Sequence, residues 1–87
     1  MNRLFVIKME SREIRGLVSP GELPELVSGF YKMSESRGAS ADYLGDGVFI
    51  AERSEAKLTL EVGDYHDSMP SRMILDELED AMKQVFN

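Results

Sequence analysis

Hydrophobic and polar positions near the start of the chain follow the short pattern of paired strands. Residues 3–9 are rich in β-branched and aromatic side chains and are too few for a helix, so they predict a strand. Residues 12–18 again contain apolar side chains, and we expect them to pair back across a turn at residues 10–11. The first part of the chain therefore predicts an antiparallel hairpin.

The next segment has the period of an amphipathic helix. After a break at residues 19–21, Pro24 suits a first helical turn, and Gly38 suits the left-handed position that ends a helix. Gly29 lies in the middle at a cost of about 1 kcal/mol relative to alanine, which indicates a close contact on that side of the helix. The apolar arc of this helix consists of Leu23, Leu26, Val27, Phe30, Tyr31 and Met33.

Two further strands are expected in the middle of the chain. A loop over residues 39–42 leads to a strand within residues 43–53, which the glycine-rich residues 45–47 bend. After a turn at residues 54–55, residues 57–63 alternate between apolar and polar side chains. This alternation predicts a sheet with one buried face and one wetter face.

The last segment predicts a second amphipathic helix, from about residue 69 or 71 to the end, with Ser68 as its N-cap. Its apolar arc consists of Ile74, Leu75, Leu78, Ala81, Met82, Val85 and Phe86. The element order is then ββαββα. We therefore expect one small α+β domain over residues 1–87, a two-layer sandwich of a four-stranded, mainly antiparallel sheet with two helices on one face.

Composition narrows the class of protein. The chain has 87 residues, of which 43% are hydrophobic and 30% charged, as is typical of one small globular domain. No window approaches the roughly 18 apolar residues of a transmembrane helix, and the first residues lack the pattern of a secretory signal. The absence of cysteine excludes disulfides and thiolate chemistry. These features favour a cytoplasmic protein that has no membrane partner.

Charge is unevenly distributed along the chain. The 10 Lys and Arg residues against 16 Asp and Glu residues give a net charge of −6. Residues 1–19 carry +2 and residues 20–87 carry −8. Nucleic-acid binding is disfavoured because contacts to phosphates need clustered basic side chains. A basic first hairpin could touch a phosphate or an acidic partner, but an ordinary solvated strand pair is the favoured interpretation of its basic residues, Arg3, Lys8, Arg12 and Arg15.

One short segment has the residue types of a metal site. Residues 63–67, Gly-Asp-Tyr-His-Asp, resemble the Gly-Asp-x-His opening of metallophosphoesterases, in which the carboxylate and the imidazole hold one of two metals. His66 is the only histidine, so it cannot complete a two-metal site. Asp64, His66 and Asp67 are at most weak ligands of a single ion. The favoured interpretation is a solvated loop before the second helix.

The expected register places aliphatic side chains on the outer face of the sheet. Cross-strand partners share a face, so residues that alternate with the core positions must point away from the helices. The residues concerned are Leu4, Val6, Leu17, Val48 and Ile50. A monomer rarely displays a contiguous aliphatic patch without a use for it. We therefore predict that this face mediates homodimerisation or partner binding.

The polar arc of the second helix is the other candidate surface. It contains an acidic stripe of Asp76, Glu77, Glu79 and Asp80, relieved only by Lys83. Such a stripe suits docking on a basic protein. The sequence thus favours a non-enzymatic interaction module without a cofactor, such as an inhibitor, immunity or antitoxin-type protein. The alternatives are a small enzyme or ligand- or metal-binding domain that uses the loop from Asp64 to Asp67, and a structural homo-oligomeric subunit.

Overall fold

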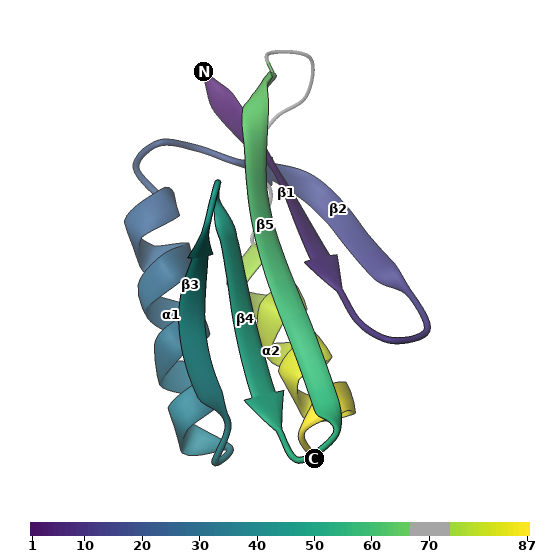
Figure 1. Cartoon of the computed structure of the whole chain (residues 1–87). Coiled ribbons are helices and arrows are strands. Elements are labelled where there is room, and N and C mark those ends of the chain that lie inside the picture. The colour runs from purple at the N-terminus through teal and green to yellow at the C-terminus, as the bar shows by residue number, and fades with distance from the viewer. Residues whose placement is uncertain (67–73) are drawn as a thin grey trace.

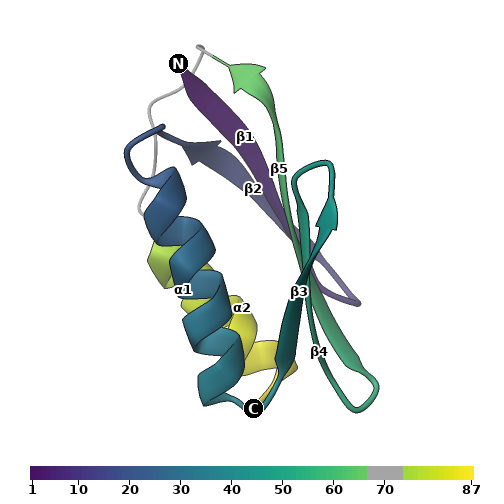
Figure 2. The same cartoon turned by 60° about the vertical axis from the view of Figure 1, so that its left-hand side comes forward.

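The computed structural model describes residues 1–66 and 74–87, which form five strands and two helices. The elements are β1 (Asn2–Lys8), β2 (Glu13–Val18), α1 (Leu23–Ser36), β3 (Ser40–Gly45), β4 (Val48–Arg53), β5 (Ala56–His66) and α2 (Ile74–Val85). The fold is α+β with an antiparallel sheet, and both helices lie on one side of that sheet (Figure 2). This arrangement confirms the predicted two-layer class.

The sheet consists of two chain segments that meet at its centre. Its strand order is β2-β1-β5-β4-β3, and every neighbouring pair is antiparallel. The β1–β2 hairpin and the β3–β4–β5 meander join where β1 pairs with β5 (Figure 1). In both predicted hairpins the register is the expected one, with Leu4 opposite Leu17 and Ala51 opposite Leu58. The long strand β5 is therefore the centre of the sheet.

The prediction of four strands was wrong, because residues 39–53 form a hairpin and not a loop followed by one strand. Ser40–Gly45 is β3, and it pairs with β4 across a turn at Asp46 and Gly47. Both turn residues have positive φ, 53° and 77°, as a two-residue type I′ turn requires. Asp-Gly is a strong signal for this turn, so the glycines reverse the chain instead of bending a single strand. The element order is ββαβββα.

The fourth expected strand is also longer than predicted. It runs through His66, so Gly63 to His66 belong to β5 and not to a loop. The expected start of the second helix, including Ser68 and Pro70, lies outside the described residues. Within those residues α2 begins at Ile74.

Helix α1 agrees with its prediction at both ends and on its buried side. Pro24 is in its first turn, and Gly38, just after it, has a left-handed φ of 71°. The expected close contact at Gly29 is present: a Cβ at this position would lie 2.9 Å from Cδ2 of Leu75. Glycine therefore allows α1 and α2 to approach each other. No helix in the described part of the chain is long and apolar enough to cross a membrane.

The core fills the space between the sheet and the two helices. Helix α1 packs against β3 and α2, and α2 packs against β5 and β2. Ser34 is buried among apolar residues, and its hydroxyl donates to the Phe30 carbonyl at 2.6 Å. The fully buried large apolar side chains are Phe5, Ile7, Val18, Leu26, Phe30, Leu58, Leu60, Leu78, Met82 and Phe86. They come from β1, β2, β5 and the two helices, with Phe86 just after α2. Their spacing follows the alternation of strands and the period of helices.

Arg53, at the end of β4, connects the sheet to the helix layer through contacts near the ends of α1 and α2. Its Nη1 donates to the carbonyl of Arg37 at 2.7 Å, where α1 ends. Its guanidinium lies 5.8 Å from the ring centroid of Phe86, just after α2. Carbonyls at the end of a helix have no partner within the helix, so this donor satisfies one of them.

Replacing Arg53 with methionine is expected to lower the free energy of unfolding by about 1–2 kcal/mol, because a charge-assisted hydrogen bond to the end of α1 is lost. Urea denaturation followed by far-UV circular dichroism measures this change. Lys57→Met is the control, because Lys57 is exposed on the next strand, and it should change the free energy by less than about 0.5 kcal/mol. Equal losses in both variants would contradict the role assigned to Arg53.

Candidate functional site

The predicted acidic stripe lies on α2, but its four carboxylates differ in their surroundings. Asp76 and Asp80 are exposed and one helical turn apart. Glu79 lies 3.5 Å from the ammonium of Lys83, and Glu77 is half-buried. Asp76 and Asp80 are therefore the members that project freely from the helix into solvent.

Acidic charge is concentrated on the helix layer. The two helices together carry six carboxylates and two lysines. The five strands carry five carboxylates and five Lys and Arg residues, so the sheet is balanced. Because both helices cover the same side of the sheet (Figure 2), the excess of negative charge belongs to one layer of the molecule. The electrostatic potential around that layer is therefore more negative than around the sheet.

The outer face of the sheet holds the five predicted aliphatic residues, Leu4, Val6, Leu17, Val48 and Ile50, as the strand register requires. Strand β5 lies between the first three and the last two, and it turns Thr59 and Glu61 to this face. Val6 and Leu17 are only 8% and 4% exposed, and the other three are half-buried. The aliphatic residues thus form two small groups on either side of a polar strand. The homodimer interface stays a prediction.

An ion pair crosses the same face. The ammonium of Lys8 lies 2.8 Å from Oε2 of Glu61 on the neighbouring strand. The hydrogen bond and the charge of Glu61 raise the pKa of Lys8 above its usual value. Lys8 is therefore paired within the sheet. Arg12, another basic residue of the first hairpin, is exposed.

The residues considered as weak metal ligands do not form a described site. Asp64 is exposed on β5, His66 is the last residue of that strand, and Asp67 lies outside the described residues. In residues 1–66 and 74–87 there is no group of three or more His, Asp or Glu side chains that could hold a metal ion.

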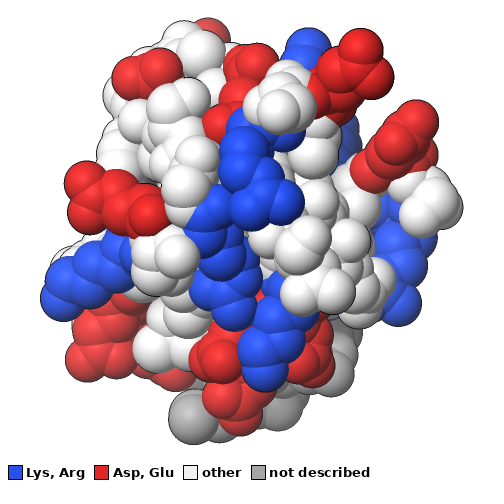
Figure 3. Space-filling model, turned by 90° about the horizontal axis from the view of Figure 1, so that it is seen from below, with Lys and Arg blue, Asp and Glu red and all other residues white. Residues whose placement is uncertain are grey.

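Basic side chains gather at one end of the molecule. Figure 3 views the end where α1 stops, β4 stops and β5 begins, and Lys and Arg form a band across its middle with carboxylates around them. Arg37, Arg53 and Lys57 belong to the segments at this end. Among these residues, Arg53 makes the contacts to Arg37 and Phe86 described above, so its charge serves the fold.

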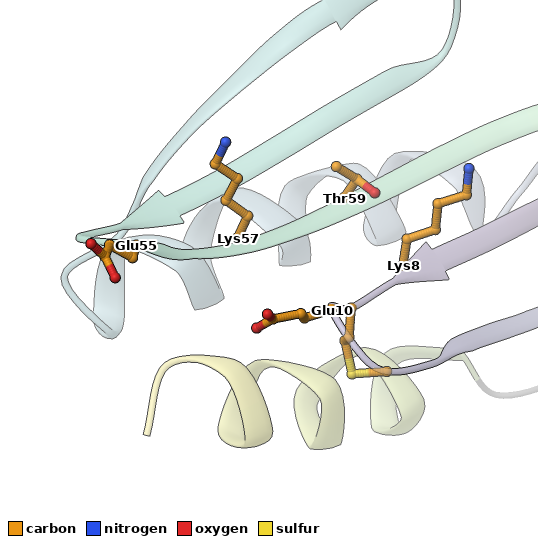
Figure 4. A pocket seen from close by; sticks show the side chains of 6 residues that line it. Lys8, Glu10, Glu55, Lys57 and Thr59 are labelled. Carbon is orange, nitrogen blue, oxygen red and sulfur yellow. The ribbon is translucent and has the colours of Figure 1, made fainter.

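A notch opens beside this band, between the β1–β2 turn and the start of β5. It has a volume of about 370 Å³ and is lined by Lys8, Met9, Glu10, Glu55, Lys57 and Thr59. Lys8, Lys57 and Thr59 rise from the strands on one side, whereas Glu10 lies below β5 (Figure 4). Two ammonium groups and two carboxylates line the same space, so the notch favours neither an anionic nor a cationic ligand.

An apolar groove lies near the opposite end, between α1 and the β3–β4 hairpin. It has a volume of about 280 Å³ and is lined by Arg3, Leu23, Val27, Tyr43, Gly47, Phe49 and Val62. The rings of Tyr43 and Phe49 are 4.7 Å apart between centroids and form an aromatic wall. The Tyr43 hydroxyl accepts a hydrogen bond from the Gly47 N–H at 3.0 Å, which fixes this ring against the turn.

Arg3 supplies the only charge among the described residues that line the groove. Its Nε donates to the carbonyl of Gly63 at 3.0 Å, and its guanidinium lies 5.4 Å from the ring centroid of Tyr65. The side chain is half-buried. No ion pair joins Arg3 to a carboxylate within residues 1–66 and 74–87. The guanidinium is therefore held in place but not neutralised there.

No local sequence pattern predicts this groove. Its residues come from β1, α1, the β3–β4 hairpin and β5, and the sequence predicts a loop over residues 39–42, where β3 begins, and a single strand in place of the hairpin. The available signal was the Asp-Gly pair at residues 46–47, which indicates a hairpin in which Gly45 pairs with Val48. A register shift between Tyr43 and Gly45 then places Tyr43 opposite Phe49. Tyr43 and Tyr65, 54% and 60% exposed, lie close to the groove and its arginine.

Comparison of the chain with protein-family models, with curated proteins and with solved structures found no match. A function must therefore be argued from the charges, cavities and contacts of this molecule.

Proposed function

We propose that the protein is a non-enzymatic interaction module whose acidic helix layer docks on a basic protein, in the manner of an inhibitor, immunity or antitoxin-type protein. The observation that carries this proposal is the excess of carboxylates on α1 and α2 over a sheet whose charges balance. A layer with a net negative charge attracts a positively charged partner over several ångströms and speeds its association.

Asp76 and Asp80 are the residues assigned to first contact. They are exposed on α2, and neither forms an ion pair with another described residue. Glu79 contributes less because Lys83 lies next to it. The affinity for the partner should therefore depend on salt, since exposed charges are screened at physiological ionic strength.

The test compares two variants of equal net charge. In Asp76→Asn/Asp80→Asn the helix layer loses two charges, and in Glu13→Gln/Asp42→Asn the exposed acids of two strands are removed instead. Each tagged protein is purified from its native host at low and at high salt, and the partner recovered with the wild type is then titrated with all three. We expect the helix variant to bind about tenfold more weakly, and the strand variant to match the wild type within about twofold.

Two results would oppose the proposal. If the helix variant binds its partner as tightly as the wild type and with the same salt dependence, the acidic layer is not the docking surface. If both variants weaken binding equally, the net charge of the protein explains the binding and the helix layer is not the specific docking surface.

A further inference from the structure

We propose that the groove between α1 and the β3–β4 hairpin binds a small amphipathic carboxylate, a molecule with one carboxylate group and an aromatic or aliphatic tail. Arg3 holds the carboxylate, and the tail lies along Tyr43 and Phe49. This site uses none of the acidic residues on α2. A test of ligand binding in the groove is therefore independent of the proposed docking function.

The assignment of the charged end rests on the unused donors of Arg3. A guanidinium has five N–H donors in a planar fork. Among the contacts of the described residues, only the Nε donor is used, by the Gly63 carbonyl. The Tyr65 ring and this carbonyl hold the plane of the guanidinium before any ligand arrives. The two terminal nitrogens remain available for a two-point hydrogen bond to a carboxylate, which is the geometry that arginine favours.

The assignment of the apolar end rests on the other lining residues. Leu23 and Val27 come from the first turns of α1, and Phe49 and Val62 come from the sheet. All four are at least half-buried, yet they still face an open space. Transfer of an apolar tail from water into this space is favourable in proportion to the area that it covers.

Charge and size exclude other classes of ligand. A neutral apolar molecule would cover the guanidinium without pairing it, and loss of water from an unpaired charge is costly. A cation would be repelled by Arg3. A volume of about 280 Å³ is at the lower end of small-molecule sites, so the tail is limited to one ring or a short chain.

The test is a nuclear magnetic resonance titration of the ¹⁵N-labelled full chain with 3-phenylpropionate. Two further probes separate the contributions: 3-phenylpropan-1-ol has the tail without the charge, and acetate has the charge without the tail. We expect saturable shifts of the amide signals of Gly47, Phe49, Val62 and Gly63 with 3-phenylpropionate. The alcohol and acetate should each bind about tenfold more weakly or not at all.

Two matched variants locate the charge. Arg3→Met removes the guanidinium and keeps a long side chain, and Arg12→Met removes one charge from the exposed β1–β2 turn. Arg3→Met should weaken 3-phenylpropionate binding about tenfold, and Arg12→Met should leave it within about twofold. The spectrum of each variant without ligand reports whether the fold is intact.

The site assignment is overturned if 3-phenylpropionate gives no saturable shifts, or if the shifts map to the notch beside Lys57. It is also overturned if the alcohol binds as tightly as the carboxylate. Should Arg3→Met not fold, the comparison of the three probes on the wild-type chain still decides the outcome.

Discussion

Replacing Gly47 with alanine is expected to lower the free energy of unfolding by about 3 kcal/mol. Gly47 has a φ of 77°, a conformation that costs an L-amino acid with a side chain about 1–2 kcal/mol. A Cβ at this position would also overlap the carbonyl oxygen of Val62 on β5, which is backbone and cannot rotate away. In addition, the Gly47 carbonyl accepts from the Val62 N–H at 2.8 Å, so any shift of the turn strains that hydrogen bond.

Substitutions at two other glycines separate the two causes of this loss of stability, the backbone strain and the contact with Val62. Gly45 has a φ of 95° and open space around a Cβ, so Gly45→Ala should show the backbone strain alone, about 1 kcal/mol. Gly21 also has open space, and its φ lies outside the left-handed range, so Gly21→Ala should stay within about 0.5 kcal/mol of the wild type. Urea denaturation followed by circular dichroism ranks the three variants. A Gly47 variant no less stable than the Gly45 variant would show that the contact with β5 is absent.

Gly16→Ala is expected to cost about 2 kcal/mol for a different reason. Gly16 lies opposite Phe5 in the β1–β2 hairpin. A Cβ at Gly16 would lie 2.7 Å from two ring carbons of Phe5, a side chain that is fully buried. The ring has no free space to enter, so the new methyl group forces the two strands or the core to shift.

A double-mutant cycle tests this explanation. Phe5→Leu alone should cost about 1.5 kcal/mol, because it removes buried ring atoms. Combined with Gly16→Ala it should cost about 1 kcal/mol less than the sum, since the methyl group then has room. Gly63→Ala on β5 is the control, because its Cβ would make only ordinary contacts, the nearest at 3.8 Å from the carbonyl oxygen of Leu4. Strict additivity of Gly16→Ala and Phe5→Leu would rule out the contact with Phe5 as the cause.

The hairpins whose register was predicted correctly are those in which local patterns leave one solution. Residues 57–63 alternate strictly, and a one-residue slip against β4 would turn Leu58 and Leu60 to solvent. Helix α1 was equally well determined, because Pro24 and Gly38 mark its ends and its apolar period is continuous. In these elements, short-range chemistry and burial favour the same structure.

The element that was missed has the weakest pattern. Strand β3 has the sequence Ser-Ala-Asp-Tyr-Leu-Gly, with no alternating apolar side. It is an edge strand, and four of its six side chains are exposed. Its pairing with β4 depends on the Asp46–Gly47 turn more than on hydrophobic burial. A strand at the edge of a sheet buries few side chains, so its sequence does not need a strong apolar pattern.

The sequence by itself determined the α+β class, the two hairpin registers and the acidic character of the last helix. Each follows from interactions between residues close in the chain, or from the rule that apolar positions must share a face. Only the tertiary structure decided that β5 lies at the centre of the sheet and separates the outer aliphatic residues into two groups. It also brought Arg3, Val27 and Phe49 to one groove. Such placements depend on the pairing of β1 with β5, more than fifty residues apart, which no local pattern specifies.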